Sequence, residues 1–140
     1  MKKISVIYAT MTKHSKKIAE AVGAALGVSA QNIADKPVVG ETDLLFVVGG
    51  LYSGESLPDL LDYVSGLSSE QVKSAALITS SVSNKKGQEG VRSRLNGNGI
   101  PVLEEFRCLG NFVFFKLSHP NKSEVQNAVD FAVRLAKKEG

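Results

Sequence analysis

The chain has 140 residues, of which 43% are apolar and 22% are charged, as is typical of one soluble globular domain. It has no apolar run near the roughly 18 residues that a membrane-spanning helix needs, and its first residues do not resemble a signal peptide. The formal charge of +3 is scattered along the chain, so we expect neither a nucleic-acid nor a membrane partner. We expect a cytoplasmic protein with a single domain over residues 1–140, and the lone Cys108 agrees because it cannot form an intrachain disulfide.

The first third of the chain predicts two buried strands with a helix between them. The run 4–8 is the first strand. A helix follows and stops at Gly27, and its apolar face is formed by Ile18, Ala19, Val22, Ala25 and Leu26. A weak strand is expected at 30–33. The entirely apolar run 44–48 predicts a strand that is covered on both faces, as in a parallel sheet.

The same alternation continues along the chain. A short helix is predicted after Pro58, with Leu60, Leu61 and Val64 on its apolar face. The run 75–79 predicts another buried strand, and the helix that follows it ends in the glycine-rich turn 97–99. The more mixed run 102–109 predicts an edge strand.

The last helix is predicted with Ser123 as its N-cap and Gln126 as the capping-box partner. Its buried stripe is expected to be Val125, Ala128, Val129, Ala132 and Leu135. Strands that alternate with helices throughout the chain predict an α/β sandwich with a parallel sheet.

Three segments that follow predicted strands have unusual compositions. They are 9–15, the glycine-rich segment 49–55 and the serine-rich segment 80–87. In an open α/β sheet, ligands bind outside the carboxyl ends of the strands. We therefore expect these three segments to form the binding site.

The first of these segments, 9–15, combines hydroxyl side chains with a helix N-terminus. Free backbone N–H groups at a helix N-terminus favour an anion, and Thr10, Thr12 and Ser15 add hydroxyl donors. This chemistry suits a phosphate group, although Thr12 or Ser15 as a simple helix cap is an alternative. The glycine-rich motifs of nucleoside-triphosphate and dinucleotide sites are absent from the sequence.

The chain resembles the flavodoxin family in the order and spacing of several short motifs. Thr10, Thr12 and Ser15 match the hydroxyls of the family's phosphate loop, while Lys13 replaces its glycine and His14 the following asparagine. Gly54 falls where the family has a glycine whose peptide turns toward the flavin on reduction, and Pro58 matches a proline after that loop. The segments "EEFRCLG" and "SHPNKSEVQNAVDFAVRL" are similar to the last strand and helix of short bacterial flavodoxin-like proteins.

This resemblance implies a three-layer fold with a five-stranded parallel sheet, order 2-1-3-4-5, and helices on both faces. It also implies FMN as a noncovalent cofactor and one-electron transfer between redox partner proteins, and we expect a monomer. The implied cofactor-binding residues are Thr10, Met11, Thr12, Lys13, His14 and Ser15 for the phosphate, and Gly50, Leu51, Tyr52, Ser53, Gly54, Ser80, Ser81, Val82 and Ser83 for the ring.

The sequence departs from the family in two ways that affect the ring site. Tyr52 supplies one aromatic side chain, but the third segment offers Val82 where many flavodoxins have a second aromatic. Flavodoxins are typically acidic, whereas this chain carries Lys85 and Lys86 in the third segment. Cations there would stabilise an anionic reduced flavin and make its second reduction potential less negative.

Two alternatives remain at this point, an FMN-dependent reductase of quinone or protoporphyrinogen type and a degenerate interaction module without flavin. We expect no metal site and no catalytic side chain: His14 is interpreted as a loop residue and Cys108 as a packed residue of the edge strand. Glu104 and Glu105 adjoin on a strand and should therefore point to opposite faces of the sheet, so they are not an acid/base pair.

Overall fold

The computed structural model describes residues 2–9, 14–52, 55–81, 87–109 and 122–137. The elements, in chain order, are β1 (Ile4–Ala9), α1 (His14–Leu26), β2 (Ala30–Asn32), the 3₁₀ turn η1 (Ile33–Asp35), β3 (Leu44–Tyr52), β4 (Glu55–Ser56), α2 (Pro58–Ser65), β5 (Ala75–Ser81), α3 (Glu89–Gly97), β6 (Val102–Leu109) and α4 (Lys122–Lys137). None of the helices in these ranges is long and apolar enough to cross a membrane.

The main sheet has the order β2-β1-β3-β5-β6, and its strands are all parallel. The short β4 lies off this path and pairs with β3 in antiparallel fashion. Without β4, this is the predicted order 2-1-3-4-5, so the fold class is confirmed. The weak strand expected at 30–33 is present as β2, and β6 is an edge strand of the part of the sheet that is described.

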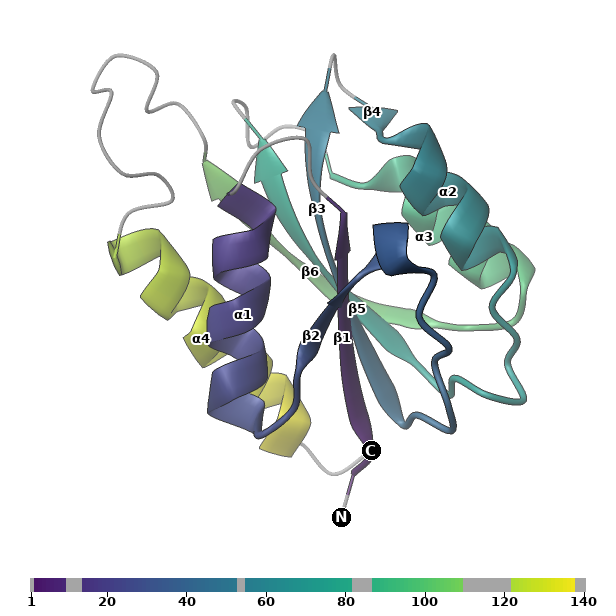
Figure 1. The fold of residues 1–140 in the computed structure, drawn as a ribbon, viewed down its shortest axis with the longest axis horizontal. Coiled ribbons are helices and arrows are strands. Elements are labelled where there is room, and N and C mark those ends of the chain that lie inside the picture. Colours follow the sequence, from purple (N-terminus) through teal and green to yellow (C-terminus); the bar gives the residue numbers. More distant parts are fainter. Residues whose placement is uncertain (1, 10–13, 53–54, 82–86, 110–121, 138–140) are drawn as a thin grey trace.

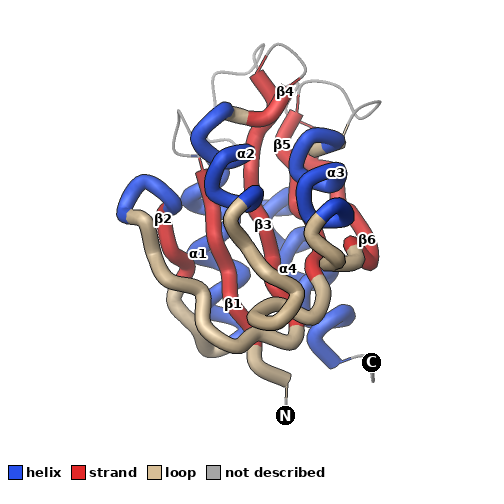
Figure 2. Tube along the Cα trace, turned by 90° about the vertical axis from the view of Figure 1, so that its right-hand side faces the viewer, coloured by secondary structure: helices blue, strands red, loops and turns tan. Residues whose placement is uncertain are grey.

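Helices cover both faces of the sheet, α1 and α4 on one and α2 and α3 on the other (Figures 1 and 2). Side chains of β1 alternate between the two faces, as the pleat of a strand requires. Val6 and Tyr8 pack in the core beneath α1 and α4, whereas Ile7 and Ala9 pack in the core beneath α2 and α3. Both faces of the central strands are therefore buried, which explains their nearly continuous apolar sequences.

The predicted apolar stripes of the first and last helices face this core, except that Ala25, which was predicted on the apolar face of α1, is exposed. Ile18, Ala19 and Val22 of α1 are almost fully buried, as are Ala128, Ala132 and Leu135 of α4. Gly27 ends α1 with a φ of 77°, a conformation that costs a glycine little, so its predicted role as the helix stop is confirmed.

Two local predictions are wrong. Strands β3 and β5 extend to Tyr52 and Ser81, beyond the predicted ends at 48 and 79. Gly49 and Gly50 still pair with β5, Leu51 and Tyr52 pair with β4, and Ser80 and Ser81 pair with β6. In α4 the helix already includes Ser123, which is therefore not the N-cap. The Gln126 amide donates to Asp130 one turn later, at 2.9 Å from N to O, so it does not form a capping box.

Candidate functional site at the carboxyl edge of the sheet

The strands β1, β3 and β5 end side by side at one edge of the sheet. Ala9 lies opposite Gly49, and Gly49 lies opposite Thr79. Helix α1 begins at this same end of the sheet, where β3 and β4 also meet (Figure 1). The described residues that flank the three predicted segments are thus neighbours in space, as the parallel topology predicts.

The predicted phosphate segment is described only at its helical end. His14 is the first residue of α1 and not a loop residue as expected, and Ser15 is the second residue, so Ser15 is not the N-cap. The Ser15 side chain is only 1% exposed. Thr10, Met11, Thr12 and Lys13 lie outside the described residues. The structure therefore places a buried hydroxyl in the first turn of α1, where backbone N–H groups lack helical partners.

The described residues of the second predicted segment, 49–52 and 55, belong to strands and not to a loop. Gly50, Leu51 and Tyr52 belong to β3, which turns back so that Leu51 pairs with Ser56 and Tyr52 with Glu55 of β4. Ser53 and Gly54 lie outside the described residues. The strand continues here because β1 and β5 pair with Gly49, and β5 still pairs with Gly50.

Gly49 is required by a close approach between β3 and the chain that enters α3. A Cβ at this position would lie 2.9 Å from Oε1 of Gln88 and 3.0 Å from Cδ2 of Leu60. The glycine therefore lets this end of β3 pack directly against α2 and the start of α3, which brings the strand ends of the candidate site close together.

The third predicted segment begins inside β5. Ser80 and Ser81 are strand residues that pair with Cys108 and Leu109 of β6. Val82, Ser83, Lys85 and Lys86 lie outside the described residues. The chain returns at Gly87 and Gln88, both buried, immediately before α3.

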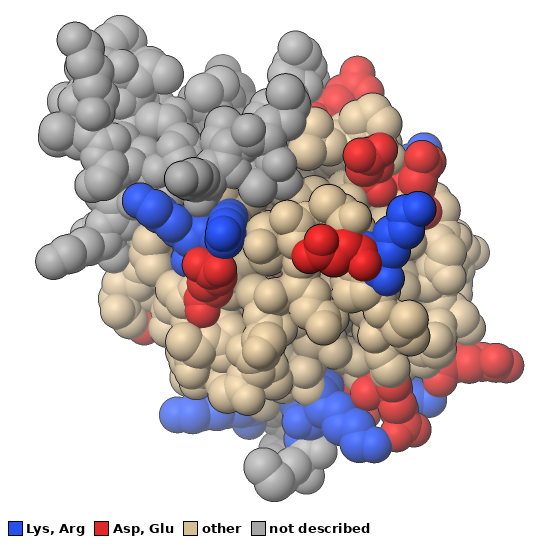
Figure 3. Space-filling view, viewed as in Figure 1, with Lys and Arg blue, Asp and Glu red and all other residues tan. Residues whose placement is uncertain are grey.

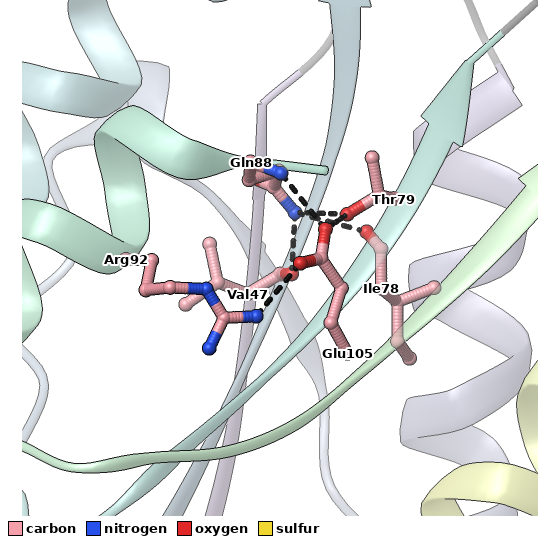
Figure 4. Close-up of polar contacts among 6 residues, drawn as sticks. All are labelled: Val47, Ile78, Thr79, Gln88, Arg92 and Glu105. Atoms are coloured by element: carbon pink, nitrogen blue, oxygen red, sulfur yellow. Dashed lines mark hydrogen bonds and ion pairs between the residues drawn. The ribbon is translucent and has the colours of Figure 1, made fainter. Parts of the chain in front are cut away.

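A buried polar cluster joins the two ends of this third segment, and the sequence did not predict it. Glu105 on β6 accepts hydrogen bonds from the Thr79 hydroxyl, from the backbone N–H of Gln88 at 2.8 Å, and from Nη2 of Arg92 at 2.8 Å (Figure 4). The neighbouring Glu104 instead pairs with Arg134 of α4, so the prediction that the two glutamates point to opposite faces is confirmed.

The ionised form of Glu105 is stabilised by these three donors. Burial alone would raise the pKa of the Glu105 carboxyl, since its side chain is only 3% exposed. The hydrogen bonds from Thr79, Gln88 and Arg92, with the charge of Arg92, outweigh burial and hold the pKa below its usual value. The mixed composition of 102–109 predicted an edge strand, but nothing local in that sequence distinguishes a buried glutamate from an exposed one.

Acidic and basic side chains are interspersed on the face seen in Figure 3, which includes α1, α2 and the ends of the central strands. Among the described residues, no group of three or more His, Cys, Asp and Glu side chains is arranged to hold a metal ion.

The comparisons with known proteins identify the fold. No protein-family model matches the chain, and none of the curated proteins matches its sequence. Oxidised flavodoxin 2 from Bacillus cereus is 17% identical with a TM-score of 0.70, over 98% of this chain and 99% of that one. A flavodoxin from the domain Archaea is 14% identical with a TM-score of 0.67, over 96% of both chains. Rubredoxin oxygen:oxidoreductase from Desulfovibrio gigas is 13% identical with a TM-score of 0.72, over 96% of this chain but 35% of that one.

Proposed function

We propose that this chain, which has the flavodoxin fold along nearly its whole length, binds FMN and carries single electrons between redox partner proteins. The observation that carries the proposal is the meeting of β1, β3 and β5 at one edge of the sheet, beside the first turn of α1. Parallel sheets of this order bind their ligands at that edge.

The described residues at this edge suit a flavin mononucleotide. The first turn of α1, with the buried Ser15, offers N–H and hydroxyl donors to a phosphate, and residues 10–15 would hold it. The ring would lie between residues 50–54 and 80–83, beside the described ends of β3 and β5. When bound, FMN supplies the electron-transfer chemistry. The polypeptide would bind and orient the ring and limit its contact with water.

The test is a titration of the purified protein with FMN and with riboflavin, followed by quenching of flavin fluorescence. We expect FMN to bind more tightly than riboflavin, because only FMN has the phosphate that residues 10–15 would bind. Replacing Thr10 and Thr12 together by valine should weaken FMN by about tenfold or more and leave riboflavin unchanged, since two hydrogen bonds to a charged group are lost.

Other outcomes would favour the alternatives. Equal affinity for FMN and riboflavin would contradict the phosphate site. Turnover of a quinone faster than free FMN achieves would support a reductase, and no binding at micromolar FMN would support an interaction module without flavin. A cytoplasmic location, a monomeric state and redox partner proteins are part of the proposal and are supported by the sequence alone.

A further inference from the structure

The Glu105 cluster links the residue directly before the third segment, 80–87, to the residue directly after it. One carboxylate oxygen, Oε2, accepts a hydrogen bond from the Thr79 hydroxyl and another from the backbone N–H of Gln88. Thr79 comes directly before this segment and Gln88 directly after it. A single side chain on β6 therefore holds together the two points where the segment leaves the sheet and returns to it (Figure 4).

The Gln88 side chain adds a second attachment at the same place. Its Nε2 lies 3.3 Å from the carbonyl oxygen of Val47, 3.2 Å from that of Ile78 and 3.1 Å from Oγ1 of Thr79. Gln88 is fully buried, and it thus contacts β3 and β5 through its side chain and β6 through its backbone. The start of α3 is fixed against three strands of the sheet.

Gly87 shows how closely the chain lies against the carboxylate. A Cβ at this position would lie 2.3 Å from both carboxylate oxygens of Glu105. The carboxylate has little freedom to move away, because Thr79, Gln88 and Arg92 all donate to it. Residue 87 must therefore be a glycine if the Gln88 amide is to reach Glu105.

We propose that Glu105 is a positioning residue for the flavin site: it ties Thr79 to Gln88 and so fixes the described residues next to them, Ser80, Ser81 and Gly87, at the edge where the ring would bind. This inference rests on the proposed function. Glu105 itself lies on the side of the sheet covered by α3, and it acts through Ser80, Ser81 and Gly87, which flank the site, and not by contact with the flavin. Arg92 completes the cluster by neutralising the carboxylate.

The test compares Glu105→Gln with Glu104→Gln, the same change at the next residue of the same strand. Glu104 pairs with Arg134 on the opposite face, so its variant also loses an ion pair and controls for charge and strand position. Amide hydrogen exchange at Gln88 is measured by NMR in the flavin-free protein, and FMN affinity is measured by fluorescence quenching. Urea unfolding of each variant shows how much of a change in the exchange rate at Gln88 is due to a change in global stability.

We expect Glu105→Gln to speed exchange at the Gln88 amide by about tenfold beyond the change in global stability, and to weaken FMN by about tenfold, since charge-assisted hydrogen bonds are lost. Glu104→Gln should leave both quantities within about twofold of the wild type. If Glu105→Gln folds poorly, two variants of Thr79 give a milder test. Thr79→Val should lower the affinity for FMN, whereas Thr79→Ser, which keeps the hydroxyl, should have the affinity of the wild type.

Three results would overturn the proposal in different ways. An unchanged Gln88 exchange rate in Glu105→Gln would show that the carboxylate does not hold this amide. Faster exchange with unchanged FMN affinity would show that the tie exists without positioning the flavin. Failure of the wild type to bind FMN would overturn the proposed function and the flavin part of this inference, while Gln88 exchange would still decide whether Glu105 fixes the segment.

Discussion

At the scale of single residues, the buried Glu105 carboxylate makes the stability of the fold depend on pH. Its pKa in the folded protein is lower than in the unfolded chain, because the three hydrogen bonds and the charge of Arg92 outweigh the effect of burial. A depressed folded-state pKa gives stability that is fully present above the unfolded-state value of about 4.3 and is lost as the pH falls through the folded-state value.

We therefore predict that Glu105→Gln flattens the acid limb of the stability curve. Urea unfolding between about pH 7 and pH 3 should show a smaller loss of unfolding free energy in this variant than in the wild type, although the variant is less stable at pH 7. Glu70→Gln, at an exposed surface position, is the control for the change in charge. Parallel curves for Glu105→Gln and the wild type would contradict the prediction.

Among the partners of Glu105, Arg92 is the one whose removal should destabilise the fold most. Arg92→Met removes the cation and leaves the carboxylate buried, and we predict a loss of about 2 kcal/mol in unfolding free energy because Arg92 is itself partly exposed. Arg94→Met, on the exposed side of the same helix, should change stability by less than about 0.5 kcal/mol. Chemical denaturation at pH 7 measures the unfolding free energy of both variants. Equal losses in the two variants would show that the Arg92–Glu105 pair does not stabilise the fold more than an exposed arginine does.

At the scale of elements, the sequence predicted strands and helices well where burial sets the pattern. The strand 44–48 is one example, because burial on both faces requires apolar residues throughout. The helix stop at Gly27 is another, because a positive φ favours glycine. The ends of β3 and β5 were missed because glycine and serine disfavour strands locally, while pairing with the neighbouring strands overrides that preference. The Glu105 cluster was missed because it joins Glu105 to residues 13 to 26 positions away in the sequence.

The turn that follows α1 returns so close to Gly23 of that helix that a side chain should not be tolerated there. A Cβ there would lie 2.6 Å from the carbonyl oxygen of Val28 and 3.2 Å from the N of Ala30, both backbone atoms. Alanine gains up to about 1 kcal/mol in a helix, but we predict that Gly23→Ala destabilises by about 1–2 kcal/mol because backbone must shift.

Gly97 is the matched control for this prediction. It is the last residue of α3, and a Cβ there would meet nothing within 4 Å. Gly97→Ala should therefore leave stability unchanged or raise it by up to about 1 kcal/mol. Thermal or urea unfolding of both variants gives the comparison, and a stabilising Gly23→Ala would contradict the close approach of Val28 and Ala30 to Gly23.

At the scale of the whole molecule, topology places the site and sequence supplies its chemistry. The chain shares its fold with two flavodoxins to which it is 14% and 17% identical, so the layered core is reproduced with mostly different residues. Strand order alone brings Ala9, Gly49 and Thr79 to one edge, which is why the location of the site could be predicted from the alternation of elements. Fold does not decide chemistry, and the cofactor must be argued from the residues at that edge.

The charge of the molecule leads to a prediction about the bound flavin, if the proposed function holds. The chain has a formal charge of +3, and Lys85 and Lys86 belong to the segment expected beside the ring. A cation about 10 Å from the ring in a water-like dielectric stabilises an added electron by roughly 0.4 kcal/mol, or on the order of 20 mV. Replacing Lys85 and Lys86 together by glutamine should therefore make the second reduction potential more negative by about 40 mV.

Redox titration of the FMN-loaded protein against reference dyes, at low and at high salt, measures this shift. Added salt should reduce the difference between the variant and the wild type, because exposed charges are screened within about 10 Å at 0.1 M salt. Lys137→Gln, at the end of α4, controls for a loss of net charge far along the chain from the proposed site. If the second reduction potential is the same in the wild type and the double variant, these lysines do not act on the flavin. The backbone dipoles at the carboxyl edge would then have to provide the electrostatic stabilisation of the reduced flavin.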